Sequence, residues 1–284
     1  LYSGLKQIPK IILNSKRADG TVIFARANKL VYILTLIVTK LCKNTWIVLV
    51  QKPDAEFMAK NDKHTLKCSY LSITEGDMKD VKTLPGARKK LISVGIKADK
   101  FVPVSNERQK ELKRKYGLDP AKPLVIHVGH CSKGRGLEDF AKIRTAQRMV
   151  VASGMFEDEN VIRMLNEANV RIHKGYLENV EEIYQMADAY LFPTRSAEFV
   201  ISIPLSVMEA LSCGVPVIGY KSFENLKEIR GTNGSVTLID DANQIDSFLP
   251  EVIKKKCDHS LLEKPESWSE VAHMVLKVVL EGNT

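Results

Sequence analysis

The chain has 284 residues, with 42 lysines and arginines against 34 aspartates and glutamates, which gives a formal net charge of +8. Apolar residues make up 44% of it and charged residues 27%, near the ~45–50% and ~25% of soluble globular proteins. This composition excludes a collagen-like, an intrinsically disordered and a disulfide-stapled miniature protein, and the length predicts about two domains.

The first part of the chain alternates short apolar runs with helical segments. Strands are expected at residues 21–25, 45–50, 70–74 and 90–94, and helices at residues 28–41 and 106–116. The most apolar run, residues 30–39, is bracketed by Lys29 and Lys40. It is too short to cross a bilayer, which takes ~20 residues. A buried helix is expected there, with an interfacial helix as the alternative.

The rest of the chain repeats the alternation more regularly. Strands are expected at residues 124–128, 147–151, 170–173, 189–192, 215–220 and 236–239, with helices between them that include residues 160–167, 180–187 and 204–213. Nearly continuous apolar strands separated by helices predict a parallel sheet covered on both faces. The fold class is therefore α/β: a doubly wound domain, preceded by a second and less complete one. In such sheets, ligands bind beyond the carboxyl ends of the strands.

Positive charge is concentrated in the first part of the chain. Residues 1–122 carry 25 Lys+Arg against 11 Asp+Glu, whereas residues 123–284 carry 17 against 23. The excess predicts an anionic partner such as a membrane surface or nucleic acid, with a solvated lysine-rich surface as the alternative. No nucleic-acid partner is expected, because interleaved aromatic residues and a recognition motif are missing. The five cysteines, an odd number without a C-x-x-C pair, predict reduced thiols and no zinc site.

The first candidate site is a glycine-rich loop that follows the strand at residues 124–128. Glycines let the backbone approach a phosphate, a following helix offers free N–H groups, and cations neutralise charge. An ordinary strand-to-helix turn with solvated cations is the alternative. The loop holds Gly129, Gly134, Gly136, Lys133 and Arg135.

Two histidines flank the start of this loop. His127 lies within the strand and is expected to be a packed core residue. His130 falls where the strand ends, in a position to contact a ligand. Metal ligation is not expected, because no carboxylate or thiol partner has a suitable spacing.

The second candidate site is the helix expected at residues 204–213. At 100° per residue, one face carries Leu205, Val207, Met208 and Leu211. Glu209 falls on the other flank, where its neighbours Ser206, Ala210 and Cys213 are small enough for a ligand to approach. A single carboxylate can accept two hydrogen bonds from a vicinal diol such as a ribose. An ordinary surface glutamate is the alternative.

These segments resemble the retaining glycosyltransferases of the family 4 (group 1) type, which have the GT-B fold. Residues 202–217, SIPLSVMEALSCGVPV, follow the family text P-L-S-V-L-E-A-M-A-C-G-x-P-V closely. Residues 128–140 align without gaps to V-G-R-x-x-x-x-K-G-L-x-x-L, and residues 95–103, GIKADKFVP, to G-V-D-x-x-x-F-x-P. The resemblance covers about residues 89–229 plus the terminal helix at residues 267–281.

The resemblance implies two Rossmann-like domains facing a cleft. It divides the chain into a partial acceptor-side domain at residues 1–103, a donor-binding domain at residues 104–265, and a helix at residues 266–284 that crosses back to the first domain. Because the chain begins at Leu1 and the first domain is short, the start of that domain is expected to be missing.

The resemblance also implies an activity. The family transfers a sugar from a UDP- or GDP-linked donor to a hydroxyl of a glycan or lipid-linked acceptor, with retention of configuration and without a metal or another cofactor. Lipid-linked acceptors imply a cytoplasmic location, peripheral on an anionic membrane face through residues 1–122.

The resemblance also assigns roles to the residues of this chain that stand at the family's site positions. His130 stands where the family arginine meets the donor pyrophosphate, Arg135 stands where its lysine does, and Glu209 matches the glutamate that grips the ribose. Lys133 is placed to compensate for the arginine that His130 replaces. The residues expected to be catalytic are Arg135, Lys133 and Glu198, and those expected to bind the donor are Gly129, His130, Gly134, Gly136, Glu209 and Gly175.

The chain departs from the family pattern at three places. Ile201 occupies the position of an earlier family glutamate, and Glu198, three residues upstream, replaces that glutamate if the loop bulges. Of the family's Gly-Gly-x-x-Glu, only Glu228 is kept, and Gln51 follows a strand where a catalytic histidine is expected. A second hypothesis therefore stays open, a catalytically degenerate relative that binds a nucleotide or a partner.

Overall fold

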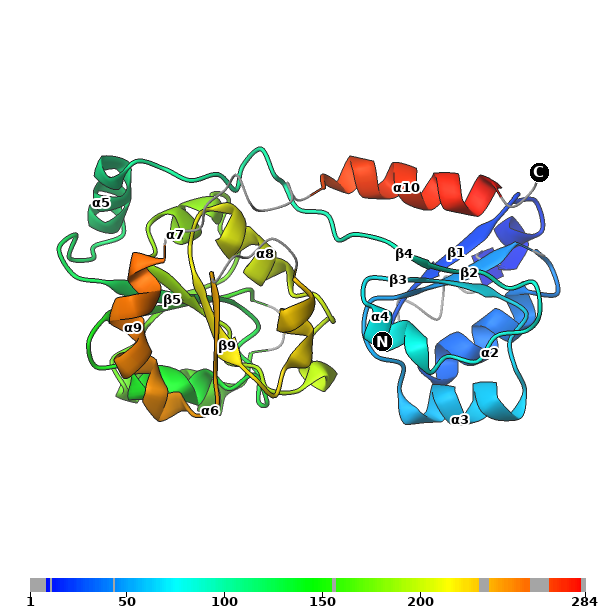
Figure 1. The fold of residues 1–284 in the computed structure, drawn as a ribbon, viewed down its shortest axis with the longest axis horizontal. Coiled ribbons are helices and arrows are strands. Elements are labelled where there is room, and N and C mark those ends of the chain that lie inside the picture. Colours follow the sequence, from blue (N-terminus) through cyan, green and yellow to red (C-terminus); the bar gives the residue numbers. More distant parts are fainter. Residues whose placement is uncertain are drawn as a thin grey trace. The chain divides into compact units, whose positions relative to one another are not determined.

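The computed structural model describes residues 9–10, 12–42, 44–154, 157–229, 235–255 and 266–281. The chain divides into two compact units, one of residues 1–94 with 268–284 and the other of residues 95–267 (Figure 1). Each unit is built on a parallel sheet of its own, so the predicted α/β class is confirmed. The last helix of the chain belongs to the first unit.

The first unit holds a four-stranded parallel sheet in the order β1-β2-β3-β4. Its strands are β1 (Thr21–Phe24), β2 (Thr45–Leu49), β3 (Ser69–Ser72) and β4 (Lys89–Leu91). Its helices are α2 (Lys29–Val38), α3 (Ala55–Lys63), α4 (Glu75–Lys79) and α10 (Trp268–Leu280). The strands and α2 agree with the prediction to within a few residues, whereas α3 and α4 were not predicted.

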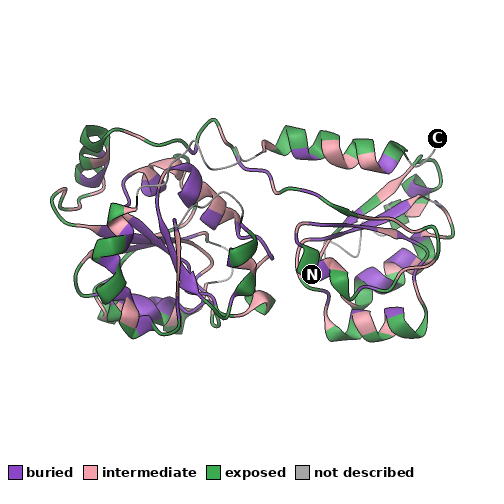
Figure 2. Ribbon diagram, viewed as in Figure 1, coloured by how far each residue is buried: buried purple, intermediate pink, exposed green. Residues whose placement is uncertain are grey.

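Alternate residues of the strands pack against helices on opposite faces of this sheet. Ile47 and Leu49 of β2 lie in one apolar cluster with residues of α2 and α3, and Trp46 and Val48 of β2 lie in another with α10. Figure 2 colours the buried positions of the strands and helices purple. In α2, the predicted burial holds for only part of the helix. Val31, Tyr32, Thr35 and Val38 are buried, whereas Leu30, Ile33 and Ile37 are exposed.

The second unit holds a six-stranded parallel sheet in the order β10-β9-β8-β5-β6-β7. Its strands are β5 (Leu124–Gly129), β6 (Gln147–Ala152), β7 (Arg171–Lys174), β8 (Ala189–Leu191), β9 (Val217–Tyr220) and β10 (Val236–Ile239). Its α-helices are α5 (Asn106–Lys115), α6 (Glu159–Glu167), α7 (Glu181–Gln185), α8 (Leu205–Ser212) and α9 (Ile245–Lys254). Its 3-10 helices are η1 (Leu137–Lys142), η2 (Ala197–Phe199), η3 (Glu224–Glu228) and η4 (Ala242–Gln244).

The strand order reverses direction between β5 and β8. The chain adds β6 and β7 on one side of β5, and then returns to add β8, β9 and β10 on the other side. Loops that leave neighbouring strands at such a point turn to opposite faces of the sheet and open a crevice at the carboxyl ends, where ligands of open α/β sheets bind.

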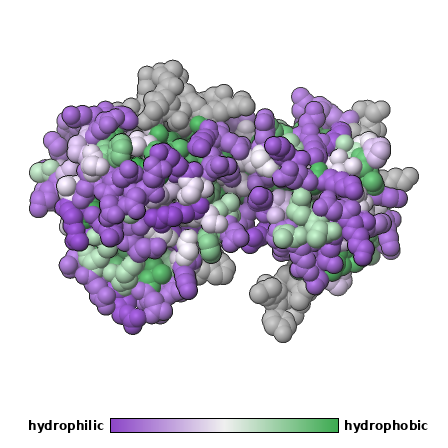
Figure 3. Space-filling model, turned by 60° about the horizontal axis from the view of Figure 1, so that its bottom comes forward, coloured by the Kyte–Doolittle hydropathy of each residue, from purple (hydrophilic) through white to green (hydrophobic). Residues whose placement is uncertain are grey.

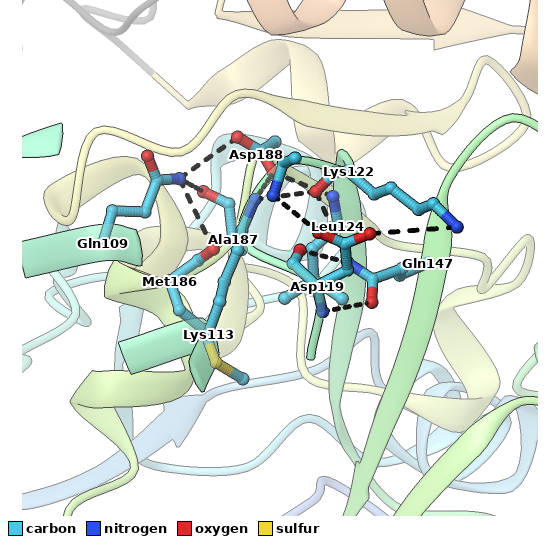
Figure 4. Close-up of polar contacts among 10 residues, drawn as sticks. Gln109, Lys113, Asp119, Lys122, Leu124, Gln147, Met186, Ala187 and Asp188 are labelled. Atoms are coloured by element: carbon cyan, nitrogen blue, oxygen red, sulfur yellow. Dashed lines mark hydrogen bonds and ion pairs between the residues drawn. The ribbon is translucent and has the colours of Figure 1, made fainter. Parts of the chain in front are cut away.

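A polar network fixes the opposite, amino ends of β5 and β8 (Figure 4). The carboxylate of Asp188, just before β8, accepts a hydrogen bond of 2.8 Å from the backbone N–H of Leu124, the first residue of β5. Lys113 of α5 donates to the same carboxylate at 2.6 Å, and Gln109 of α5 donates at 3.1 Å. The network therefore joins the two strands and α5 at this end of the sheet.

The outer surface is largely polar. On the face that Figure 3 draws, hydrophilic residues cover most of each unit, and apolar residues form small separate groups. Among the described residues, no helix combines the length and the apolarity needed to cross a membrane. The four described cysteines, Cys42, Cys68, Cys131 and Cys213, are buried free thiols, whereas Cys257 lies outside the described residues.

Candidate functional site

The candidate site lies at the crevice between the carboxyl ends of β5 and β8. The pairing of the two strands ends at Ile126 and Tyr190. Beyond this pair, the imidazole of His127 reaches across, with its Nδ1 atom 3.1 Å from the carbonyl oxygen of Leu191. His127 is fully buried, which confirms that it is a packed core histidine. Its ring therefore lies buried just beyond the point where the pairing of the two strands ends.

Arg135 crosses this crevice from the loop after β5 to the loop after β8. Its Nη1 atom donates to the carbonyl oxygen of Phe199 at 2.7 Å. The side chain is buried, and burial lowers the pKa of the guanidinium from its usual value. Among the described residues, no carboxylate forms an ion pair with Arg135. A buried cation without a carboxylate partner is costly unless another anion supplies the missing charge.

The glycines of the loop allow the two loops to pack closely. Gly134 has φ +86°, and a Cβ there would lie 2.6 Å from the ring of Phe199. Gly136 has φ +75°, and a Cβ there would collide with the carbonyl oxygen of Pro193. Both backbone conformations favour glycine. The loop after β5 and the loop after β8 are therefore held against each other at these two positions.

The segment that follows this loop differs from the prediction. It is η1, a 3-10 helix of six residues, and it carries Glu138 and Asp139 in its first turn. That the N–H groups at the start of this short helix meet a phosphate stays a prediction, and no side chain caps them. The left-handed backbone of Gly136 and its close approach to Pro193 end the loop in a tight turn, and the carboxylate of Asp139 is paired with Arg195. Arg135 is a buried cation of the loop that precedes this helix.

The remaining predicted residues near this loop differ in exposure. His130 is half-buried, and its Nδ1 atom lies 2.9 Å from the hydroxyl oxygen of Ser153, just after β6. Lys133 is exposed. Gly175, just after β7, has φ +94° and donates its N–H to the carbonyl oxygen of Ala152 at 3.0 Å. These residues all lie at the carboxyl edge of the sheet, but Lys133 extends into solvent.

Glu209 of α8 is partly buried and has a specific partner. One oxygen of its carboxylate accepts a hydrogen bond of 2.7 Å from the hydroxyl of Tyr184 in α7. Burial raises the pKa of Glu209 to about 7, although this hydrogen bond and the positive charge of Lys97 oppose the rise. An ordinary surface glutamate would be fully hydrated. Glu209 is instead a fixed carboxylate that changes its charge near neutral pH.

Tyr184 was not predicted as a site residue. It is buried, it stacks on Tyr190 with ring centroids 5.9 Å apart, and it meets Phe101 edge-to-face at 5.5 Å. Tyr190 in turn donates to the hydroxyl of Ser206 in α8 at 2.8 Å. An aromatic layer therefore runs beneath the site between the region of Arg135 and that of Glu209.

Glu198 lies in η2, one residue before the carbonyl that holds Arg135. Its side chain is exposed, and its backbone N–H donates to the hydroxyl of Ser196 at 3.3 Å. Ile201, at the position of the family glutamate, is partly buried. The structure thus brings Glu198 to the same loop as the Phe199–Arg135 contact but leaves its carboxylate in solvent.

A second polar cluster, which was also not predicted, supports the loop after β8. The buried carboxylate of Asp139 accepts hydrogen bonds from Arg195 at 2.8 Å and from the hydroxyl of Tyr220 at 2.5 Å. The guanidinium of Arg195 lies 3.9 Å from the centre of the Tyr220 ring. Desolvation raises the pKa of Asp139, and these two donors oppose the rise. The cluster joins η1, the loop after β8 and the end of β9.

Comparisons with known proteins relate part of this chain to a family of enzymes. Residues 122–258 match the family model described as glycosyl transferases group 1. N-acetyl-alpha-D-glucosaminyl L-malate synthase of Bacillus anthracis is 29% identical over 119 residues, which are 38% of this chain and 30% of that protein. Alpha-galactosylglucosyldiacylglycerol synthase of Streptococcus pneumoniae is 27% identical over 138 residues, 43% of this chain and 35% of that protein. The matched segments thus span only about a third of the length of these relatives.

Two solved structures resemble nearly the whole chain. A glycosyltransferase from Rickettsia africae has a TM-score of 0.74 at 13% identity, covering 99% of this chain and 81% of that one. The Anabaena protein HepE, crystallised with UDP and glucose, has a TM-score of 0.74 at 12% identity, covering 96% of this chain and 80% of that one. At these identities the likeness is one of fold. The expected GT-B fold is confirmed.

Proposed function

We propose a function on the premise that residues 122–258 belong to the group 1 glycosyltransferases and that the chain has the GT-B fold. The protein transfers a sugar from a nucleotide-activated donor to an acceptor hydroxyl. The observation that carries the proposal is the buried guanidinium of Arg135, which has no carboxylate partner among the described residues. A donor diphosphate in the crevice would provide the missing negative charge through charge-assisted hydrogen bonds.

In the proposed reaction, the bond between the anomeric carbon and the β-phosphate oxygen breaks. The acceptor hydroxyl attacks from the face that the diphosphate leaves, its oxygen bonds to the anomeric carbon, and its proton passes to the leaving phosphate. This retains the configuration and requires no metal. Arg135 stabilises the charge that develops on the leaving group, which is the role of preorganised cations in such sites. His130 and Lys133 add donors and positive charge at the same phosphates.

Glu209 is proposed to bind the ribose of the donor. Its ionised carboxylate can accept hydrogen bonds from both hydroxyls of a vicinal diol, and Tyr184 holds one of its oxygens in place. Glu198 is proposed to contact the transferred sugar, and Gly175 to lie against the donor where the chain leaves β7. The HepE structure contains UDP and glucose, so UDP-glucose is the first donor to test, followed by GDP-linked sugars.

The acceptor side is proposed to involve an anionic membrane surface and residues 1–122. In α2, Leu30, Ile33 and Ile37 are exposed on one face, with Lys29 at the start of the helix. Residues 1–94 carry 17 Lys+Arg against 7 Asp+Glu, and positive charge near a surface favours anionic headgroups. The S. pneumoniae relative is named as the synthase of a glycosylated diacylglycerol, alpha-galactosylglucosyldiacylglycerol, which also supports a lipid-linked acceptor. Equal cosedimentation with neutral and anionic vesicles would contradict this part.

A donor panel tests the proposed reaction. Nucleoside diphosphates and their sugar conjugates are first ranked by the shift that they cause in the melting temperature, and the strongest donor is then assayed for transfer to lipid and glycan acceptors. Binding with transfer supports an enzyme. Binding without hydrolysis or transfer on any acceptor supports the alternative, a degenerate relative that serves as a nucleotide-binding module.

A further inference from the structure

Two buried polar atoms beyond the paired part of β5 and β8 lack hydrogen-bond partners among the described residues. They are Nε2 of His127 and Nε of Arg135, and neither makes a hydrogen bond among the described residues. Most buried polar atoms in proteins are paired, so such exceptions call for an explanation. Nε of Arg135 can only donate a hydrogen bond. The role of Nε2 in His127 depends on which ring nitrogen carries the proton.

The surroundings of His127 fix its tautomer. Nδ1 lies 3.1 Å from the carbonyl oxygen of Leu191, which can only accept, and 3.3 Å from the hydroxyl oxygen of Tyr190. Because the hydroxyl proton of Tyr190 is donated to Ser206 at 2.8 Å, both oxygens act as acceptors, and Nδ1 carries the proton. Burial, followed by the positive charge of Arg135, lowers the pKa of His127 to about 3. The ring is therefore neutral at physiological pH, and Nε2 presents an unshared electron pair.

Nε2 and the guanidinium of Arg135 both lie close to Gly129. A Cβ atom at Gly129 would lie 2.9 Å from Nε2 of His127 and 3.0 Å from Nη2 of Arg135. Both nitrogens thus lie next to the position that a Cβ atom of residue 129 would occupy, and a glycine leaves this position empty. The imidazole also packs against Phe140, at 6.5 Å between ring centroids, and against Tyr190, at 5.7 Å. This packing limits rotation of the ring away from Arg135.

We propose that His127 is a positioning residue for Arg135, whose guanidinium donates to Nε2 of the imidazole once a donor diphosphate draws it away from the Phe199 carbonyl. The inference rests on the proposed function. A guanidinium has five N–H donors, and Nη1 now donates to Phe199. A diphosphate takes one edge of the guanidinium in a bidentate contact. An acceptor on another edge then fixes the plane of the guanidinium toward the phosphates.

The test compares His127→Phe with His127→Gln, each alone and combined with Arg135→Gln. Phe keeps an aromatic ring between Phe140 and Tyr190 but has no acceptor, whereas Gln restores an acceptor. Isothermal titration with inorganic pyrophosphate and with UDP gives the dissociation constants, and thermal melting reports the fold. We expect His127→Phe to weaken both ligands about tenfold, His127→Gln to recover most of this loss, and His127→Phe to add nothing when Arg135→Gln is present.

Transfer kinetics separate positioning from a merely structural role. We expect His127→Phe to lower kcat by more than it raises KM for the donor, because a misdirected guanidinium stabilises the leaving diphosphate poorly. If His127→Phe does not fold, Gly129→Ala replaces it. The new methyl group occupies the point between the two side chains without changing His127 itself, and it should produce the same weakening.

The outcomes distinguish this inference from the proposed function. If Arg135→Gln loses pyrophosphate binding while His127→Phe and Gly129→Ala bind as tightly as wild type, the inference is wrong and the function stands. The inference would also be wrong if His127→Phe lowered the affinity equally in wild type and in the Arg135→Gln variant, because the effect would then not act through Arg135. If Arg135→Gln itself binds both ligands normally, the proposed function fails.

Discussion

The hydroxyl of Tyr184 donates a hydrogen bond of 2.7 Å to the carboxylate of Glu209, and this contact joins α7 to α8 beneath the candidate donor site. The two residues are 25 positions apart in the sequence. The bond directs one carboxylate oxygen inward and leaves the other available to a ligand. It also favours the ionised form of Glu209 against the effect of burial. Tyr184 thus orients the carboxylate of Glu209, the residue proposed to bind the ribose, and favours its ionised form.

Removal of this hydroxyl should weaken nucleotide binding selectively. In Tyr184→Phe, the pKa of Glu209 rises further because a hydrogen bond to its ionised form is lost. We expect the dissociation constant for UDP at pH 7 to increase about fivefold to tenfold, while that for inorganic pyrophosphate, which has no ribose, stays unchanged. Titration calorimetry with both ligands measures this. An equal loss for both ligands would show that Tyr184 does not act through Glu209.

The pKa of Glu209, raised to about 7, predicts a pH dependence of UDP binding. Above pH 7 the carboxylate is ionised and accepts from the ribose, whereas below pH 7 it is protonated and UDP affinity falls. Titrations of UDP from pH 5.5 to pH 8.5, with inorganic pyrophosphate as the reference for phosphate ionisation, measure this. Glu209→Gln should be weaker than wild type at pH 8.5 and should lack the step near pH 7. A step of equal size in that variant would assign the titration to another group.

The same pKa predicts how stability changes with pH. The folded state binds the Glu209 proton more tightly than the unfolded chain, because the pKa is raised on folding. The protonated carboxyl therefore contributes stability that is fully present below pH ~4.5 and is lost as the pH rises through about 7. Urea unfolding should show Glu209→Gln gaining stability relative to wild type across this range. A constant difference between the two proteins would contradict the raised pKa.

Two glycines with positive φ form a matched pair for a test of loop packing. At Gly136, alanine would meet both an unfavourable backbone conformation and the carbonyl of Pro193, whereas at Gly175 nothing lies within 4 Å of the added Cβ. Gly175→Ala should cost about 1 kcal/mol of unfolding free energy. Gly136→Ala should cost at least about twice as much, as measured by urea unfolding. Similar costs at both positions would mean that the two loops are not held together at Gly136.

The polar network at the amino ends of the strands predicts a large loss of stability on breaking one ion pair. Lys113 is buried and pairs with Asp188 at 2.6 Å. Asp188→Asn would leave this ammonium without its anion, and such a loss costs about 3–5 kcal/mol. Lys122, exposed and 3.9 Å from Asp119, provides the control, and Lys122→Gln should stay within about 0.5 kcal/mol of wild type. Denaturant unfolding that gave equal values for both variants would contradict a stabilising role for the network.

The sequence predicted the strands well because their burial depends on local apolar runs. TWIVLV and LVIHV are buried on both faces, and β2 and β5 fall within a residue of the predicted ranges. Helix α3 was not predicted because its sequence, AEFMAKNDK, is mostly polar. A capping signal was present, however. Asp54 precedes this helix, and its side chain accepts a hydrogen bond from the backbone N–H of Phe57 at 2.7 Å.

The candidate site was predictable in its charged residues but not in their partners. Arg135 and Glu209 stand out in local motifs, and the structure places Arg135 in the loop after β5 and Glu209 on α8 of the same unit. The contact between Arg135 and Phe199 joins residues 64 positions apart. It exists because β8 returns to lie beside β5, and no local pattern encodes that neighbour.

The most direct measurement is the binding of UDP to wild type and to Arg135→Gln by titration calorimetry, with thermal melting of both proteins. Wild type should bind UDP, whereas Arg135→Gln should lose at least about 30-fold in affinity. Its melting temperature should not fall, because the change removes a buried cation that has no carboxylate partner among the described residues. Equal affinity of the two proteins for UDP would contradict a donor diphosphate at Arg135.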